Sequence, residues 1–210
     1  ERAGAEPVII MGMTECSPII TQTVPDDPLD IKVTTAGVPL PHVEIRVVDP
    51  STGATTPTGM EGELLIRGFL VTAGYFDMPQ HTAETIDKDG WLHSGDIATL
   101  DEGGYLRIVG RIKDMLIRGG ENIYPVEIED YLLGHQDIAE AQVVGVPDAE
   151  LGEEIFAFVV PRDGRTIDGE AIRNWCRRTM SRQKLPRYVA VLERMPQTAN
   201  GKVRKVDLRA

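Results

Sequence analysis

Cysteine is scarce in this sequence, which contains Cys16 and Cys176 far apart from each other. Two distant cysteines exclude a disulfide framework and a zinc site built on cysteine pairs. They suit a reducing compartment, so we expect a cytoplasmic protein. The sequence also lacks a run of about 18 apolar residues, and we therefore expect no transmembrane segment. It begins with ERAGAEPVII, without a start methionine or a signal peptide, so we expect a piece of a longer chain.

Basic residues are outnumbered, with 22 Lys and Arg against 33 Asp and Glu, and the formal net charge is −11. Such a chain repels nucleic acid and anionic lipid, so neither is expected as a partner. A basic cluster near the C-terminus runs against this average and contains Lys202, Arg204, Lys205 and Arg209. Hydrophobic residues make up 41% of the chain, which is enough for a core in one or two domains.

Alternation of apolar and polar residues predicts five strands. They lie at residues 43–48, 63–67, 105–109, 141–146 and 155–160. Clusters of Asp, Pro, Ser and Gly at 49–53, 101–104 and 161–164 mark turns between them. The first two strands therefore form an antiparallel pair joined by a loop.

Two helices are predicted in the second half. Pro125 suits a first helical position, and acidic residues follow it at the positive end of the helix dipole, with the end near Gly134. The second helix has Asp168 as its N-cap and runs to about Met180 on a 3.6-residue apolar period.

The character of the sequence changes near residues 110–114. Before this point the chain reads as strands, turns and glycines, and after it the order strand, helix, strand, strand, helix, strand predicts a small α+β domain. We place a domain boundary at 111–114, although on pattern alone an ordinary β-turn is the commoner explanation for these four residues.

Several short stretches carry residues suited to phosphate or sugar chemistry. Thr14 and Glu15 follow the apolar run 8–11, so they lie at the end of a predicted strand, where ligands bind in open α/β sheets. A hydroxyl beside a carboxylate can hold Mg²⁺ and a phosphate oxygen. Asp96 follows a tight turn and could accept both hydroxyls of a ribose. Taken alone, Thr14 and Glu15 are better explained as a strand-to-loop turn with a solvated Glu, and the alternative for Asp96 is a turn aspartate.

His93 lies near Asp96 but has no obvious partner, so a packed, hydrogen-bonded histidine is favoured over a catalytic base. Arg111 could reach a phosphate or a ribose. Gly119 and Gly120 allow a close backbone approach to a ligand, or simply form a glycine-rich hairpin. Lys202 stands on a mobile loop rich in Pro, Asn and Gly, where it could neutralise developing charge or merely be a solvated surface lysine.

In order and spacing, these stretches resemble the adenylate-forming superfamily of acyl-CoA synthetases, luciferases and peptide-synthetase adenylation domains. The matching stretches are MGMTE (11–15), GELLIRG (62–68), GYFDMP (74–79), GWLHSGD (90–96), GRIKDMLIRGGENIYPVEIE (110–129) and PQTANGKVRK (196–205). The resemblance implies an α/β plus α+β fold. Residues 1–112 would be the C-terminal, β-rich part of a large AMP-binding domain, and residues 113–210 a small mobile domain with its hinge at Lys113.

The resemblance also implies an activity, the formation of an acyl-adenylate from ATP and a carboxylic acid, which the thiol of CoA then attacks. By position, Thr14 and Glu15 would serve the phosphates and Mg²⁺, and Asp96 with Arg111 the ribose. Lys202 would bridge the acid and the α-phosphate. After a domain rotation, Gly119, Gly120 and Glu121 would face the pantetheine tunnel. Met11 and Gly12 would lie near the nucleotide.

Two departures from the family pattern qualify these expectations. Met11 stands where the family usually has an aromatic residue near the adenine, and its polarisable sulfur can still pack on a base. The phosphate loop rich in Ser, Thr and Gly, and most of the acid pocket, would lie upstream of Glu1. We therefore expect ATP, Mg²⁺, CoA and a fatty or medium-chain acid as ligands of the longer protein, and an inactive chain by itself.

Two other functions stay open at this point. One is an adenylation domain that loads a carrier protein, and the other is a non-catalytic nucleotide-binding or interaction module. Homo-oligomerisation is also left open.

Overall fold

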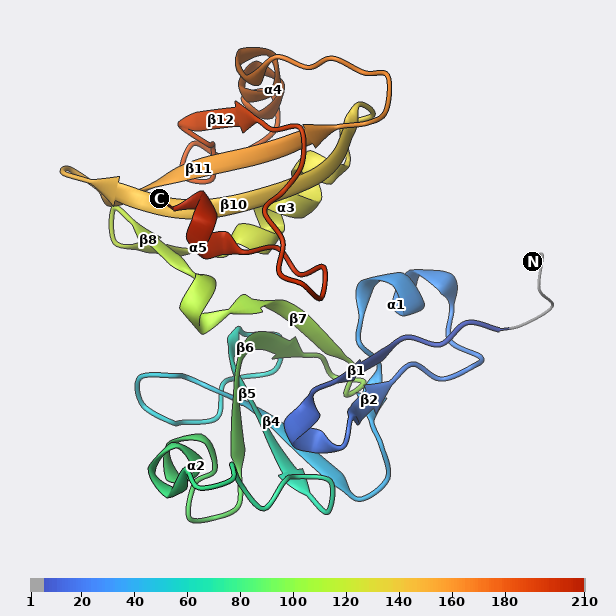
Figure 1. The fold of residues 1–210 in the computed structure, drawn as a ribbon. Coiled ribbons are helices and arrows are strands. Elements are labelled where there is room, and N and C mark those ends of the chain that lie inside the picture. The colour runs from blue at the N-terminus through green and yellow to red at the C-terminus, as the bar shows by residue number, and fades with distance from the viewer. Residues whose placement is uncertain (1–5, 210) are drawn as a thin grey trace. The chain divides into compact units, whose positions relative to one another are not determined.

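The computed structural model describes residues 6–209 of the chain, which divides into two compact units, Glu1–Ile112 and Lys113–Ala210. We call them the N-terminal and the C-terminal unit. Both combine strands with a few helices, so the expected mixed fold class is confirmed (Figure 1). Between residues 6 and 209, no helix is long and apolar enough to cross a membrane.

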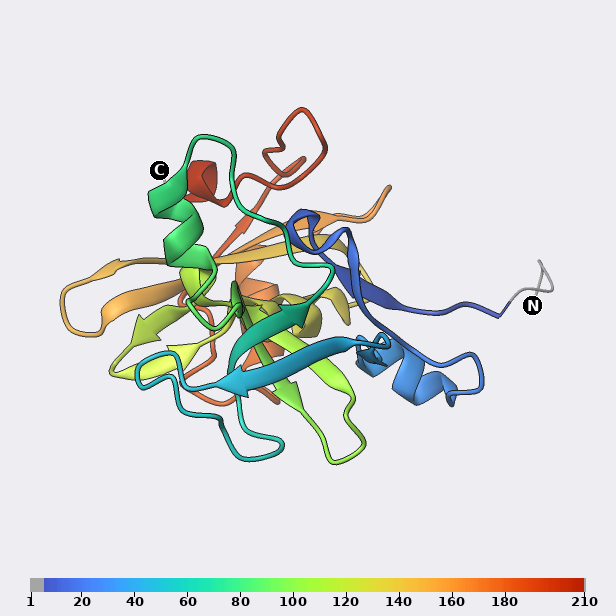
Figure 2. The ribbon, with the colours of Figure 1, turned by 90° about the horizontal axis from the view of Figure 1, so that it is seen from below.

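The N-terminal unit contains two antiparallel sheets. The first has the order β1 (Ile10–Gly12), β2 (Ile19–Gln22), β3 (Val38–Pro39), and the second is a meander of β4 (Val43–Val48), β5 (Gly62–Gly68), β6 (Leu92–Leu100) and β7 (Leu106–Arg111). Two short helices, α1 (Leu29–Thr34) and α2 (Pro79–Thr85), lie at opposite ends of this unit (Figures 1 and 2).

The strand β5 lies between β4 and β6 and is buried on both faces. Leu64 and Ile66 enter the main core of the unit, whereas Leu65 packs with Val48 and Trp91 on the other face. A strand covered on both sides has an almost continuous apolar sequence, which explains the LLI run of this segment. The second face is completed by arginines, because the guanidinium carbons of Arg46 and Arg67 lie 4.2 and 4.4 Å from the Trp91 ring centre.

The C-terminal unit is built on one five-stranded sheet. Its order is β10 (Ile138–Asp148), β11 (Gly152–Pro161), β8 (Leu116–Arg118), β9 (Glu121–Ile123), and β12 (Tyr188–Val191) pairs in parallel with β11. Its helices are α3 (Pro125–Leu133), α4 (Gly169–Cys176) and α5 (Lys205–Leu208).

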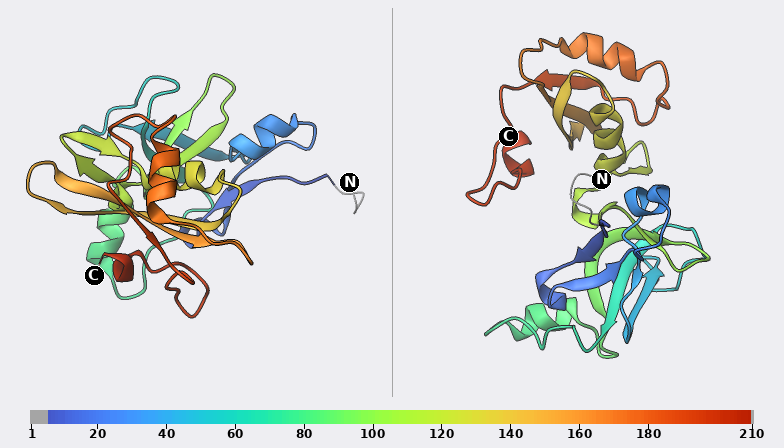
Figure 3. Two further views of the ribbon diagram at one scale, coloured as in Figure 1. Left: turned by 90° about the horizontal axis from the view of Figure 1, so that it is seen from above. Right: turned by 90° about the vertical axis from the view of Figure 1, so that its right-hand side faces the viewer.

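The two faces of this sheet carry different cores. On one face, α3 and α4 pack their apolar sides against alternate residues of β10 and β11, such as Val143 and Ala157. The neighbours Val144 and Phe158 belong to a second cluster with Met195 and Leu208 of the C-terminal segment. Figure 3 shows the ribbon of this unit from two further sides. This division follows from the two-residue period of a strand.

The sequence-based helices are confirmed, with one error of length. Pro125 is the first residue of α3, and the Asp168 carboxylate accepts the N–H of Ala171 as N-cap of α4 at 3.0 Å. However, α4 ends at Cys176, four residues before the expected Met180. Beyond Cys176 the chain continues as turns, in which Arg178 N–H donates to the Trp175 carbonyl and Met180 N–H to the Cys176 carbonyl. Met180 still packs against the core.

Candidate functional site

Asp96 and Arg111 lie side by side on neighbouring strands. They are register partners of β6 and β7, and Arg111 Nε donates to Asp96 Oδ1 at 2.8 Å. Asp96 is buried, with 7% of its surface exposed, whereas half of the Arg111 side chain reaches solvent. The structure therefore brings these two expected site residues together, with an acid whose position is set by an arginine that also extends to the surface.

A buried carboxylate supports the turn that precedes Asp96. His93 Nδ1 lies 2.9 Å from Glu63 Oε2, and Gly95 N–H donates to Glu63 Oε1 at 3.2 Å. Gly95 has a φ of 70°, which glycine adopts without strain. The partner that the sequence left unidentified for His93 is thus Glu63, and the expectation of a packed, hydrogen-bonded histidine is confirmed. Glu63 is the second residue of the GELLIRG stretch, but its local sequence does not indicate this contact, because 30 residues separate the two side chains.

Thr14 and Glu15 belong to a short 3₁₀ turn, η1 (Thr14–Cys16), that follows β1. The expected position at the end of a strand is confirmed, because only Met13 separates them from β1. The sheet differs from an open α/β sheet, since β1 pairs antiparallel with β2 in a small sheet and its Ile10 is 52% exposed. Gly12 allows the tight return of the chain, because a Cβ at this position would lie 1.6 Å from the Pro18 carbonyl oxygen.

The Glu15 side chain is held by a residue that the sequence analysis did not single out. Tyr75 donates its hydroxyl to Glu15 Oε1 at 2.9 Å, and Thr72 N–H donates to the Glu15 carbonyl at 2.8 Å. Burial, together with this bond and the charge of Glu15, raises the pKa of Tyr75, so the phenol stays protonated and donates. Tyr75 lies in the GYFDMP stretch, which gave a signal for the family but not for this contact. Met11 is partly buried and packs against the core of the same unit.

Magnesium was expected at Glu15, and the surroundings fit one form of such a site. Within residues 6–209, no three His, Cys, Asp or Glu side chains gather in a metal-binding cluster. Magnesium commonly keeps several waters and takes one or two carboxylates together with the phosphates of its substrate. Glu15 therefore suits a metal that arrives with a nucleotide, and a site made of protein ligands alone does not fit.

In the C-terminal unit, Gly119 and Gly120 form the turn between β8 and β9. Their φ values of 60° and 86° match the primed two-residue turns of tight hairpins, which favour glycine. Gln183 donates its amide to Glu121 Oε1 at 3.3 Å beside this turn. We call residues 116–123 the glycine hairpin, and all three expected residues lie at its tip.

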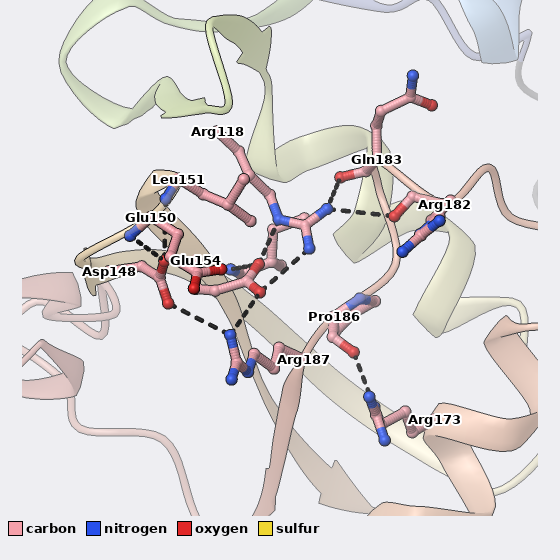
Figure 4. A network of polar contacts seen from close by, with 11 residues as sticks. Arg118, Asp148, Glu150, Leu151, Glu154, Arg173, Arg182, Gln183, Pro186 and Arg187 are labelled. Atoms are coloured by element: carbon pink, nitrogen blue, oxygen red, sulfur yellow. Dashed lines mark hydrogen bonds and ion pairs between the residues drawn. The ribbon is translucent and has the colours of Figure 1, made fainter.

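Below the tip, the glycine hairpin meets the polar network of Figure 4. Arg118 points from β8 toward Glu154 of β11, and both side chains are largely buried. Arg187, the residue before β12, belongs to the same network, and its Nη1 donates to Asp148 Oδ2 at 3.3 Å. Glu154 was not among the predicted site residues, because its place within β11 before the apolar run IFAFVV gives no local sign of its burial or of its partner.

Lys202 is exposed and is the last residue of a turn that hydrogen bonds hold together. Thr198 N–H donates to the Lys202 carbonyl at 2.8 Å, Gly201 N–H donates to the Thr198 carbonyl at 2.9 Å, and Gln197 bridges Val203. The expected loop is therefore a hydrogen-bonded hairpin, which we call the lysine hairpin (residues 196–204). Lys113 is exposed in the short turn η2 (Ile112–Asp114), where the two compact units meet in sequence.

Comparison with known proteins places these features in a family context. Residues 1–76 match the family described as AMP-binding enzyme, and residues 127–202 match the AMP-binding enzyme C-terminal domain. A putative acyl-CoA synthetase YngI from Bacillus subtilis is 47% identical over 210 residues, which is 100% of this chain and 38% of the relative. The mitochondrial medium-chain acyl-CoA ligase ACSF2 of Rattus norvegicus is 47% identical over 97% of this chain and 33% of its own length.

Solved structures show the same likeness. ATP-bound MatB from Rhodopseudomonas palustris has a TM-score of 0.90 at 36% identity, over 98% of this chain and 40% of that one. The o-succinylbenzoate CoA synthetase MenE from Bacillus subtilis, in complex with an acyl-adenylate, has a TM-score of 0.90 at 31% identity. That match covers 100% of this chain and 42% of MenE. The chain thus spans well under half the length of these relatives.

Proposed function

The chain belongs to the adenylate-forming superfamily, and from this premise we propose that the protein containing it joins a carboxylic acid to coenzyme A through an acyl-adenylate. Relatives that carry the names of acyl-CoA synthetase and medium-chain acyl-CoA ligase, each 47% identical, support this reaction. Neighbours solved with ATP and with an acyl-adenylate support a nucleotide site. Because the chain spans 38% of the first relative, the activity belongs to a longer protein.

The observation that carries the proposal is the ion pair between the buried Asp96 and the half-exposed Arg111. A carboxylate that an arginine holds in place is suited to accept two neighbouring sugar hydroxyls, because each of its oxygens can accept more than one hydrogen bond. Arg111 reaches solvent with half of its side chain, so it can approach the sugar or a phosphate while it keeps its bond to Asp96. We therefore assign the ribose of ATP to this pair.

The phosphates are assigned to the segment around η1. The Tyr75 hydroxyl fixes the orientation of the Glu15 carboxylate, and the preceding residue, Thr14, is exposed. Bound Mg²⁺ would neutralise phosphate charge and favour attack by the acid carboxylate on the α-phosphorus. Gly12 and Met11 precede this segment, where the backbone without a Cβ and the thioether would lie close to the nucleotide.

The C-terminal unit is assigned the two remaining tasks. Lys202 would offset the repulsion between the acid carboxylate and the α-phosphate during adenylation. Gly119, Gly120 and Glu121 would line the path of the pantetheine thiol in the second half-reaction. Lys113 would be the pivot between these two states, so that one unit serves both reactions in turn.

A fatty or medium-chain acid is the proposed substrate, and CoA the proposed acceptor. The relatives named as medium-chain ligases, between 42% and 47% identical, favour this class of acid. Both cysteines are buried and carry free thiols, which suits a reducing compartment such as the cytoplasm. A carrier-protein thiol is the alternative acceptor, and the product of the assay below separates the two.

The test uses the protein at its full natural length. With ATP, Mg²⁺, CoA and acids of increasing chain length, we expect pyrophosphate release and an acyl-CoA product identified by mass spectrometry. Lys202→Ala should lower acyl-adenylate formation by about 10²-fold or more, since it removes a charge that acts in the transition state. The same variant should convert supplied acyl-adenylate to acyl-CoA at nearly the unmodified rate. An equal loss of both half-reactions would contradict the role of Lys202, and the absence of any acid-dependent pyrophosphate release would contradict the function.

A further inference from the structure

Glu154 of β11 is almost fully buried and bonds the glycine hairpin. It is 2% exposed, and Arg118 of β8 donates to both of its oxygens, through Nε to Oε1 and through Nη2 to Oε2 at 3.1 Å. Ile155 N–H donates to Oε1 at 3.2 Å, and Arg187 Nη1 lies 3.6 Å from Oε2. A buried carboxylate with this set of donors is fully engaged by the protein, so it is suited to hold other groups in place.

The third nitrogen of Arg118 bonds a different segment. Its Nη1 donates to the carbonyls of Arg182 and Gln183, at 3.2 and 2.9 Å, in the segment that leads into β12 (Figure 4). Gln183 in turn donates its side-chain amide to Glu121 at the hairpin tip. One planar guanidinium therefore fixes the hairpin against β11 and against the segment 181–187.

The glycine hairpin needs such fixing because its strands are short. It consists of β8 and β9 with three residues each, and its ladder to β11 pairs Arg118 with Gly152. A two-stranded hairpin is marginally stable on its own. Leu116 and Ile123 enter the core. Gly119 N–H donates to the Leu151 carbonyl at 2.8 Å, and Ile117 N–H donates to Glu153 Oε2 at 2.7 Å. The Arg118–Glu154 pair adds the buried charged contact between the hairpin and β11.

A second buried carboxylate, Glu129 of α3, anchors the lysine hairpin. It is 8% exposed, and its Oε1 accepts the Val143 N–H and the Lys205 ammonium, each at 2.8 Å. Lys205 begins α5 directly after the base of the lysine hairpin, where Arg204 N–H donates to the Pro196 carbonyl at 2.8 Å. The pair therefore fixes the chain three residues after Lys202.

We propose that Glu154 and Glu129 are separate positioning residues, Glu154 for the glycine hairpin and Glu129 for the lysine hairpin. The inference rests on the proposed function, which gives these hairpins to thioester formation and to adenylation respectively. Glu154 bonds Arg118, whereas Glu129 bonds Lys205. Each ion pair can therefore be weakened by a mutation that leaves the other intact. Loss of one charge from a buried pair leaves its partner uncompensated and frees the attached segment.

The first test needs no activity and uses the 210-residue chain. Hydrogen–deuterium exchange followed by mass spectrometry should show faster exchange at residues 117–121 in Glu154→Gln and at residues 197–204 in Glu129→Gln. The matched control is Glu44→Gln, which removes a carboxylate from an exposed pair with Arg67 in the N-terminal unit and should leave both regions unchanged. Arg118→Lys and Lys205→Gln test the same pairs from the other side and replace any glutamine variant that fails to fold. Equal acceleration of both hairpins in each variant, or none, would overturn the proposal.

The second test measures the two half-reactions in the full-length protein. A displacement of a reacting group by about 1 Å costs roughly 10²-fold in rate, so each variant should lose at least tenfold in its own half-reaction. Glu154→Gln should slow the conversion of supplied acyl-adenylate to acyl-CoA, and Glu129→Gln should slow acyl-adenylate formation. A general loss of stability would instead lower both rates together, and that result would overturn the proposal. If the unmodified protein showed neither half-reaction, the proposed function would fail, and the exchange experiment would still decide the anchoring roles.

Discussion

Asp96 is the residue on which the nucleotide assignment depends most directly. Asp96→Asn keeps the shape of the side chain but removes the charge that strengthens bonds to sugar hydroxyls. Hydrogen bonds to charged groups contribute about 1.5–3 kcal/mol, so the KM for ATP should rise about tenfold or more in the full-length protein. Steady-state kinetics at a saturating concentration of the carboxylic acid would measure this KM. Glu102→Gln, an exposed change in the loop after β6, serves as the control. An unchanged KM for ATP would contradict the assignment of the ribose to Asp96 and Arg111.

The two thiols make a prediction that is independent of the proposed reaction. Burial raises the pKa of Cys16 and of Cys176 to about 11, and the charge of Glu15 adds to the effect at Cys16. At pH 8 both thiols should therefore react with a thiol reagent about 10²-fold more slowly in the folded chain than in urea. The unfolded thiols lose protons above about pH 8.5 while the folded ones keep them, so stability should fall as the pH rises past this value. Fast reaction of either thiol in the native chain would contradict its burial.

The side-chain partners within the site could not be predicted from local sequence. His93 bonds Glu63, and Tyr75 bonds Glu15 over 60 residues of chain. Such contacts depend on strand register and on the path of the chain between sheets, which neither residue's neighbours specify. The pairing of Asp96 with Arg111 is similar, since a β-bulge between Ile97 and Ala98 shifts the register of β6 and β7.

At the scale of single elements, helix α4 offers a direct test of a local signal. Asp168→Ala removes the bond from the carboxylate to the Ala171 N–H and should lower the free energy of unfolding by about 1 kcal/mol. Urea unfolding followed by the fluorescence of Trp175, which lies within α4, measures this change. Asp163→Ala, in the exposed turn before the helix, is the matched control and should have little effect. A cap variant as stable as its control would show that tertiary contacts alone hold the helix.

Elements with strong local signals were predicted well, and those without were missed. The expected strands at 43–48 and 155–160 correspond to β4 and β11, and Pro125 begins α3 as expected. By contrast, β3 has two residues and α5 has four. Segments this short have no period to detect, and their structure comes from the surfaces that they cover. In the small sheet, β1 overlaps the strand expected at the apolar run 8–11, whereas the short strands β2 and β3 were missed.

At the scale of the whole molecule, the 210 residues can be assayed as they stand. They span 38% of their Bacillus subtilis relative, so we expect no acid-dependent pyrophosphate release from this chain with ATP and Mg²⁺. The full-length protein under the same conditions is the positive control. Pyrophosphate release by the 210-residue chain alone would show that the adenylation machinery is more compact than we propose.

The aromatic side chains provide an optical consequence of the division into two units. Of the two tryptophans in the sequence, Trp91 is stacked with arginines in the N-terminal unit, and Trp175 belongs to α4 of the C-terminal unit, where its ring lies 4.5 Å from that of Tyr131. Each unit therefore contains one tryptophan in its own surroundings. Replacement of either indole by phenylalanine leaves a single tryptophan, so with excitation selective for tryptophan the melting of each half can be recorded in the intact chain without an added label.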